Sequence, residues 1–149
     1  TKENMTVPEG LFEQYEHLPD IFSGLQAQEE VLASEWAIQT YVPLSAPRPY
    51  PWFLVAYEEL ISDGDSAIED LFEALGRPVP KKAFDQLRTP SATASSELEE
   101  AEAHAQLPGW RNRLYTEQID RILQVVHEVG VTAYDETLHP DRDALVSER

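Results

Sequence analysis

The sequence predicts an α/β fold to which this chain contributes mostly helices and one buried strand. Residues 52–57 are consecutively apolar or aromatic, which is typical of a strand buried on both faces. Stretches with helical periodicity lie on both sides of this run. A buried helix is the alternative interpretation, but the run is short, and prolines stand at or before its start: Pro43, Pro47, Pro49 and Pro51.

A strand buried on both faces needs neighbouring strands to pair with its backbone N–H and C=O groups. No second run of this kind occurs in the 149 residues. We therefore expect the chain to be part of a larger domain. The missing strands would come from an N-terminal part of the same domain or from a completing chain. The first residue is Thr1 rather than a methionine, which is also expected for a fragment.

Composition narrows the class of protein. The net charge of −17 argues against binding to duplex nucleic acid, which depends on cation–phosphate contacts. The absence of cysteine excludes disulfides, a thiol nucleophile and cysteine–zinc sites. No stretch approaches the ~20 apolar residues that a membrane span needs, and no signal-peptide pattern is present. We expect an acidic, soluble, cytoplasmic protein without membrane contact, in which a homo-oligomer is one possibility.

The N-terminal third is predicted to be helical in two parts. Four residues before Pro19 form one apolar helical stripe: Leu11, Phe12, Tyr15 and Leu18. A second helix is expected from about 25 to 44, with Trp36 as a core anchor, because an aromatic residue at helical spacing is usually a packing residue. The proline-rich stretch 43–51 is expected to stop this helix and lead into the strand.

Two further helices are expected after a turn at 62–65. Ser66 and Glu69 have capping-box spacing, and Gly76 stands where a C-terminal glycine belongs. Between them lies a regular apolar stripe made of Ile68, Leu71, Phe72 and Leu75. A short helix at about 81–87 follows.

The last third begins with a polar loop over 89–108. Thr116 is predicted to cap an amphipathic helix that Gly130 ends. The sequence then becomes polar. We therefore expect residues 1–134 to be the C-terminal part of a domain and residues 135–149 to be a polar tail.

Standard catalytic patterns are absent from the sequence. There is no glycine-rich phosphate loop, no Gly-x-Ser-x-Gly and no His-Glu-x-x-His. The histidines have no metal-ligand spacing: His17, His104, His127 and His139. We assign no catalytic residue and expect no metal.

One ordered set of short motifs points to a family. Tyr57-Glu58-Glu59-Leu60 ends the expected strand, a helix then reads Leu-Phe-Glu-Ala-Leu-Gly-Arg-Pro over residues 71–78, and Gly109-Trp110-Arg111 precedes the last long helix. This order and spacing resembles the C-terminal half of the sulfotransferase family. The resemblance covers residues 25–134.

The resemblance implies a P-loop-like α/β fold that transfers a sulfuryl group from 3′-phosphoadenosine 5′-phosphosulfate (PAPS) to a hydroxyl or amine of a small-molecule acceptor, without a metal. In that family the phosphate loop, the main 3′-phosphate contacts and the usual catalytic base lie N-terminal to the matched region. The chain by itself is therefore expected to be catalytically incomplete.

The resemblance carries over to few residues. Gly109, Trp110 and Arg111 match the family's loop that closes over the nucleotide, and Arg113 adds a nearby positive charge. An arginine fork suits a phosphate, and an indole can cover an adenine. The chain has Ala-Gln-Leu-Pro over 105–108, where the cytosolic family pattern has Arg-Lys-Gly before the tryptophan, which puts the 3′-phosphate contact in doubt. Packing of Trp110 onto the last helix is the alternative.

Two other interpretations remain open at this stage. In the first, the chain is an acidic, mostly helical protein-interaction module without chemistry, in which residues 52–57 pair with the sheet edge of a partner. In the second, it is a member of the sulfotransferase family that has kept the fold and lost the activity. For Glu58, the sequence favours a structural hydrogen bond or ion pair over a role as a base.

Overall fold

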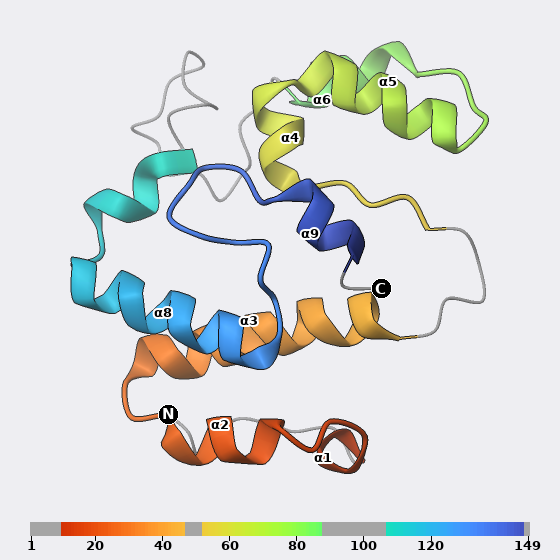
Figure 1. Cartoon of the computed structure of the whole chain (residues 1–149). Helices are drawn as coiled ribbons and strands as arrows, with labels where there is room; N and C mark the ends of the chain where they lie inside the picture. The colour runs from red at the N-terminus through yellow and green to blue at the C-terminus, as the bar shows by residue number, and fades with distance from the viewer. Residues whose placement is uncertain (1–9, 47–51, 88–106, 148–149) are drawn as a thin grey trace. The chain divides into compact units, whose positions relative to one another are not determined.

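A computed structural model describes residues 10–46, 52–87 and 107–147 of the chain. The chain divides into two compact units. Unit 1 comprises Thr1–Pro47 and Leu114–Arg149, and unit 2 comprises Arg48–Arg113. Figure 1 shows that the regular elements of the described residues are helices.

The strand predicted for residues 52–57 is absent, and the described residues contain no sheet. Residues 52–56 have no regular secondary structure, and α4 (Tyr57–Ser62) begins where the strand was expected to end. Trp52 and Phe53 are 48% and 41% exposed, so the run is not buried on both faces. The prediction of a P-loop-like α/β fold with a buried strand is therefore wrong for this chain.

The physical reason lies in what surrounds the run. An extended segment becomes a strand only when a neighbour accepts and donates its backbone hydrogen bonds, and the described residues supply none. Glu58 and Glu59 also lie in the first turn of α4, where their negative charge interacts favourably with the helix dipole and stabilises the helix. Ala56 nevertheless keeps extended dihedral angles, with φ −82° and ψ 136°.

Unit 1 is built from α1 (Leu11–Gln14), α2 (Leu18–Gly24), α3 (Gln28–Ser45), α8 (Thr116–Val129) and α9 (Arg142–Ser147). Figure 1 shows α3 and α8 side by side, and α2 also packs against α8. Their core contains Leu11, Tyr15, Leu18, Phe22, Leu25, Val31, Ala33, Ala37, Val125, Val126, Val129 and Val131. Within the stretch expected to be a polar tail, Leu145 of α9 is only 4% exposed.

Helix α3 begins three residues later than predicted and ends slightly later. The backbone N–H groups of Gln26 and Ala27 both donate to Glu30 Oε2 at 2.6 Å, which fixes the start of the helix. Pro43 lies inside the last turns instead of ending the helix. Pro43 does not break the helix, which continues to Ser45.

Trp36 does not act as the expected core anchor. Its side chain is 42% exposed, and its ring meets Tyr134 edge to face, with the centroids 5.0 Å apart. The buried side of α3 is occupied by smaller residues, of which Ala37 is fully buried. Because these buried residues are small, α8 can approach α3 closely. The large indole of Trp36 lies at the margin of the core instead.

Helix α8 begins one residue earlier than predicted and ends at Gly130 as predicted. Tyr115, one residue before the predicted cap Thr116, is the N-cap, and its N–H donates to Gln118 Oε1 at 3.1 Å. At the other end Gly130 has φ +117°, as predicted for a terminating glycine. The N–H groups of Gly130 and Val131 bond back to the carbonyls of His127 and Val126, which completes a Schellman motif.

An ion pair joins the two long helices of unit 1. Arg121 Nη2 of α8 donates to Glu29 Oε1 of α3. This hydrogen bond holds the pKa of Glu29 below its ordinary value of 4.5. Bonds from the N–H groups of Ala27 and Gln26 likewise lower the pKa of Glu30.

Unit 2 contains α4, α5 (Gly64–Ala74), α6 (Lys81–Leu87) and the 3₁₀ helix η2 (Leu107–Asn112). Helix α5 starts before the predicted capping pair Ser66 and Glu69, with Asp63 as its N-cap. Gly76 has φ +62° and ends the helix as predicted, and α6 covers the predicted range. Most of the predicted loop over 89–108 lies outside the described residues.

Unit 2 buries little apolar surface. Among its described side chains only Ala56 and Ile68 belong to the buried class. Leu75, the last member of the apolar stripe on α5, is 55% exposed. The end of this stripe is therefore uncovered within the described part of unit 2, whereas Ile68 is buried and Leu71 and Phe72 are half-buried.

We expect Gly130→Ala to destabilise the chain more than Gly10→Ala does. Both glycines have positive φ, but a Cβ at Gly130 would lie 2.6 Å from Tyr41 Cε2, whereas a Cβ at Gly10 meets no atom of the described residues within 4 Å. Left-handed strain costs about 1–2 kcal/mol in either variant, and the clash adds to it only in Gly130→Ala. Thermal unfolding followed by circular dichroism measures the difference. Equal losses of thermal stability in the two variants would show that contact with Tyr41 does not require a glycine at position 130.

Stability is expected to fall as the pH drops below the ordinary glutamate pKa of 4.5. Lowered pKa values in the folded chain mean that Glu29 and Glu30 contribute stability above this pH and lose it as they become protonated. Glu29→Gln should therefore reduce the steepness of the decline in denaturant titrations between about pH 5 and pH 3. Glu13→Gln, which alters an exposed carboxylate of α1, is the control. An unchanged slope in Glu29→Gln would contradict the account.

Candidate functional site

The residues predicted to contact a nucleotide lie on and directly after η2. Gly109, Trp110 and Arg111 belong to this single 3₁₀ helix, and Arg113 follows it. Pro108 favours the start of such a turn because its ring fixes φ near the helical value. The Arg113 N–H donates to the Trp110 carbonyl at 3.0 Å and closes the turn.

The turn brings the indole and one guanidinium together. Arg111 Cζ lies over the Trp110 ring, 5.2 Å from its centroid, within the range of a cation–π interaction. Trp110 is half-buried and Arg111 is exposed. The ring therefore supports a cation that stays available to solvent and to an anionic ligand.

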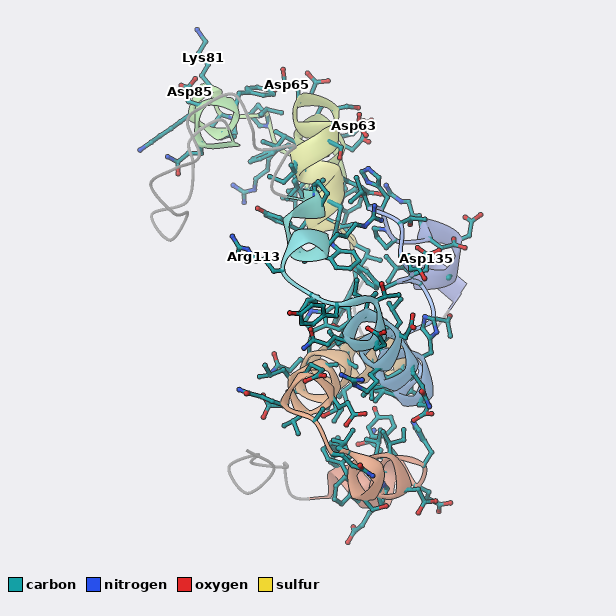
Figure 2. All side chains as sticks on the ribbon, turned by 90° about the vertical axis from the view of Figure 1, so that its left-hand side faces the viewer. Asp63, Asp65, Lys81, Asp85, Arg113 and Asp135 are labelled. Atoms are coloured by element: carbon teal, nitrogen blue, oxygen red, sulfur yellow. The ribbon has the colours of Figure 1, made fainter. Side chains whose placement is uncertain are left out.

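Arg113 supplies a second exposed cation beside this pair. Figure 2 shows its side chain extending away from the ribbon. Among the described residues, and apart from the chain neighbours of Gly109, no atom lies within 4 Å of the position that a Cβ would take, so these residues do not require a glycine here. The four predicted residues thus form one short surface turn in unit 2.

Positive charge is concentrated in unit 2. It contains seven of the chain's 11 lysines and arginines but only 12 of its 28 acidic residues. Unit 1 has four cationic and 16 acidic residues. An anion therefore meets less repulsion at unit 2, although Asp63, Asp65 and Asp85 also project from its surface in Figure 2.

Tyr57 and Glu58 both lie in the first turn of α4 instead of at a strand end. Tyr57 is 60% exposed. Glu58 is half-buried, and its Oε2 atom is shielded from solvent without a hydrogen-bond partner among the described residues. The sequence predicts a structural hydrogen bond or ion pair for Glu58, whereas its Oε2 atom makes neither with the described residues. The periodicity of the sequence does not indicate an oxygen without a partner.

Two of the histidines are used by the fold of unit 1. His17 Nε2 lies 3.0 Å from the Val129 carbonyl oxygen, and His127 Nε2 lies 2.7 Å from that of Tyr134. No group of three or more histidine or acidic side chains within the described ranges has a geometry that could hold a metal ion. In the same ranges no helix has both the length and the apolar character that crossing a bilayer requires.

Comparison with known protein families, curated proteins and solved structures gives no match for this chain. The resemblance to sulfotransferases therefore depends on the motifs of the sequence itself.

Proposed function

We propose that this chain forms the C-terminal part of a PAPS-dependent sulfotransferase and that Gly109, Trp110 and Arg111 cover the nucleotide. The observation that carries the proposal is the exposed Arg111 guanidinium held over the Trp110 indole on η2. A nucleotide carries phosphate groups, which bind a cation, and an adenine, which packs against an aromatic ring, so a site for it needs a cation and an aromatic ring side by side.

The residues of this turn have complementary roles in the proposal. The Arg111 guanidinium donates to phosphate oxygens, Arg113 adds positive charge, and the Trp110 ring covers the base and shields it from water. PAPS supplies the activated sulfuryl group, and the acceptor is a hydroxyl or amine of a small molecule. The residues assigned here bind and cover the nucleotide, and the catalytic base lies outside them.

The order of the sequence motifs along the chain supports the proposal. Tyr-Glu-Glu-Leu begins α4, Gly76 ends α5, the Gly-Trp-Arg turn is η2, and an amphipathic helix ending at Gly130 follows. Because the described residues contain no sheet, the proposal rests on these motifs and on the Trp110–Arg111 contact.

Arg111→Ala is expected to weaken binding of 3′-phosphoadenosine 5′-phosphate about tenfold or more, because a charge-assisted hydrogen bond contributes about 1.5–3 kcal/mol. The measurement is an NMR titration of the labelled 149-residue chain at low salt. In the unmodified chain the Trp110 indole N–H and the Arg111 backbone amide should show the largest shifts. Binding is expected to be weak, because the family's other nucleotide contacts lie outside the matched residues.

Arg77→Ala is the matched control, since it removes an exposed arginine from the same unit and leaves the Arg77 backbone N–H bonded to Phe72. If both variants lose the same affinity, the binding is general charge attraction. If millimolar nucleotide leaves the Trp110 indole signal unmoved, this turn does not cover a nucleotide and the proposal fails.

A second candidate function is an acidic helical interaction module without chemistry. The specific observation in its favour is that the regular elements among the described residues of unit 2 are helices, and that Trp52, Phe53, Tyr57 and Leu75 are exposed. Such a module would use this apolar surface to bind a partner protein. Partner binding without any nucleotide-dependent shift at Trp110 would favour this second function.

A further inference from the structure

A short segment between α5 and α6 combines two prolines with three cations. It reads Arg-Pro-Val-Pro-Lys-Lys over residues 77–82 and contains no acidic residue. Residues 77–80 lie outside the helices, and α6 begins at Lys81. Pro78 and Pro80 are exposed, whereas Val79 is half-buried. The rings of both prolines are therefore accessible to another molecule.

The prolines restrict the backbone of this segment. A proline ring fixes its own φ at about −65°, and a residue that precedes a proline is kept out of the helical region. Pro78 and Pro80 therefore restrict themselves and also Arg77 and Val79, which precede them. These restrictions favour the polyproline II conformation, which has three residues per turn and no internal hydrogen bonds. A segment restricted in this way loses little conformational entropy when it binds a partner.

Hydrogen bonds to the two neighbouring helices hold both ends of the segment. The Arg77 N–H donates to the Phe72 carbonyl at 2.9 Å, directly after Gly76, whose φ is +62°. The Pro80 carbonyl accepts from the Ala83 N–H in α6 at 2.8 Å. Helices α5 and α6 also pack against each other. The segment is therefore fixed between two helices, with its proline rings exposed.

The three cations of the segment have no anionic partner in the described structure. Arg77, Lys81 and Lys82 are exposed, and none of their side chains has a hydrogen bond or an ion pair with a described residue. Figure 2 shows Lys81 extending away from the ribbon of α6. The acidic residues that flank the segment in the sequence are Glu73 and Asp85. In a chain with 28 acidic and 11 cationic residues, these unpaired cations are available to a partner that carries carboxylates.

We propose that Arg77–Lys82 is a docking motif for a domain of a partner protein that has an aromatic-lined groove with carboxylates at its rim. Aromatic side chains pack against exposed proline rings, which is how such grooves bind proline-rich segments. With three residues per turn, Arg77 and Pro80 share one edge of the segment. A proline ring and a guanidinium along one edge fit an aromatic groove beside a carboxylate. The inference goes beyond the proposed nucleotide site and does not depend on it.

Two other occupants fit the segment less well. A simple polyanion would pair with the cations but would leave the proline rings uncovered. A second copy of the chain would bring a net charge of −17 to a molecule of the same charge. The experiment below separates both of these occupants from the proposed partner.

The test is an NMR titration of the labelled 149-residue chain with a WW domain, a proline-recognition domain with an aromatic-lined groove. One form of the domain carries glutamates beside the groove, and a second form carries glutamines at the same positions. The glutamate form should shift the backbone amides of Arg77, Val79, Lys81 and Lys82 more than any others, with a Kd below about 1 mM. The glutamine form should bind about tenfold more weakly, because every ion pair at the rim is lost.

Two variants of the chain separate the contribution of the prolines from that of the charges. Pro80→Ala should weaken binding of the glutamate form about tenfold, because a ring that packs in the groove is lost. Arg77→Gln keeps both prolines and should weaken binding about threefold, as expected for an exposed ion pair. Pro19→Ala removes an exposed proline beside Asp20 in α2 and is the control, which should leave the affinity unchanged. Circular dichroism checks that each variant remains helical.

The absence of shifts at Arg77–Lys82 with about 1 mM domain would overturn the proposal. So would equal affinity of the two forms of the domain, or equal affinity of the unmodified chain and Pro80→Ala. Equal shifts with a hexaglutamate peptide would identify a polyanion as the occupant, and shifts that depend on the concentration of the chain alone would identify a second copy. Both results would contradict the proposal. The nucleotide titration is read at Trp110, so the failure of one proposal is distinguishable from failure of the other.

Discussion

The close approach of α3 and α8 is the constraint on which unit 1 depends. Ala37 on α3 and Val129 on α8 are fully buried, and at Gly130 the chain passes so near the Tyr41 ring that a Cβ would overlap it. Full burial of one valine side chain contributes about 1.5–3 kcal/mol. Glu29 and Arg121 pair across the same two helices. A glycine with positive φ therefore both ends α8 and permits the packing that holds unit 1 together.

Unit 2 is organised differently. Its helices pack in chain order, α4 on α5 and α5 on α6, but Leu75 at the end of α5 and the aromatic residues Trp52 and Phe53 before α4 are exposed. The same unit holds most of the chain's cations and the Trp110–Arg111 pair. Both proposals therefore concern unit 2, where apolar surface and positive charge remain available for binding another molecule.

The sequence predicts elements well where their determinants are local. Gly76 and Gly130 end α5 and α8 as expected, because each glycine supplies the positive φ of a Schellman motif. The prediction fails where distant groups decide. An apolar run specifies a strand only if other strands pair with it, and residues 52–56 have none in the described structure. For the candidate site, the sequence identified the Gly-Trp-Arg turn, but only the coordinates reveal the stacking of Arg111 on Trp110 and the unmet oxygen of Glu58.

The central claim is that the Trp110–Arg111 turn covers a nucleotide. Photolabelling with 8-azidoadenosine 3′,5′-bisphosphate tests it most directly, because the azide reports what lies against the adenine. After tryptic digestion, the account predicts that the label falls on the peptide ending at Arg111, which contains Trp110, and that excess unmodified nucleotide prevents it. Label spread over the helices of unit 1, or label that the competing nucleotide does not reduce, would contradict the account.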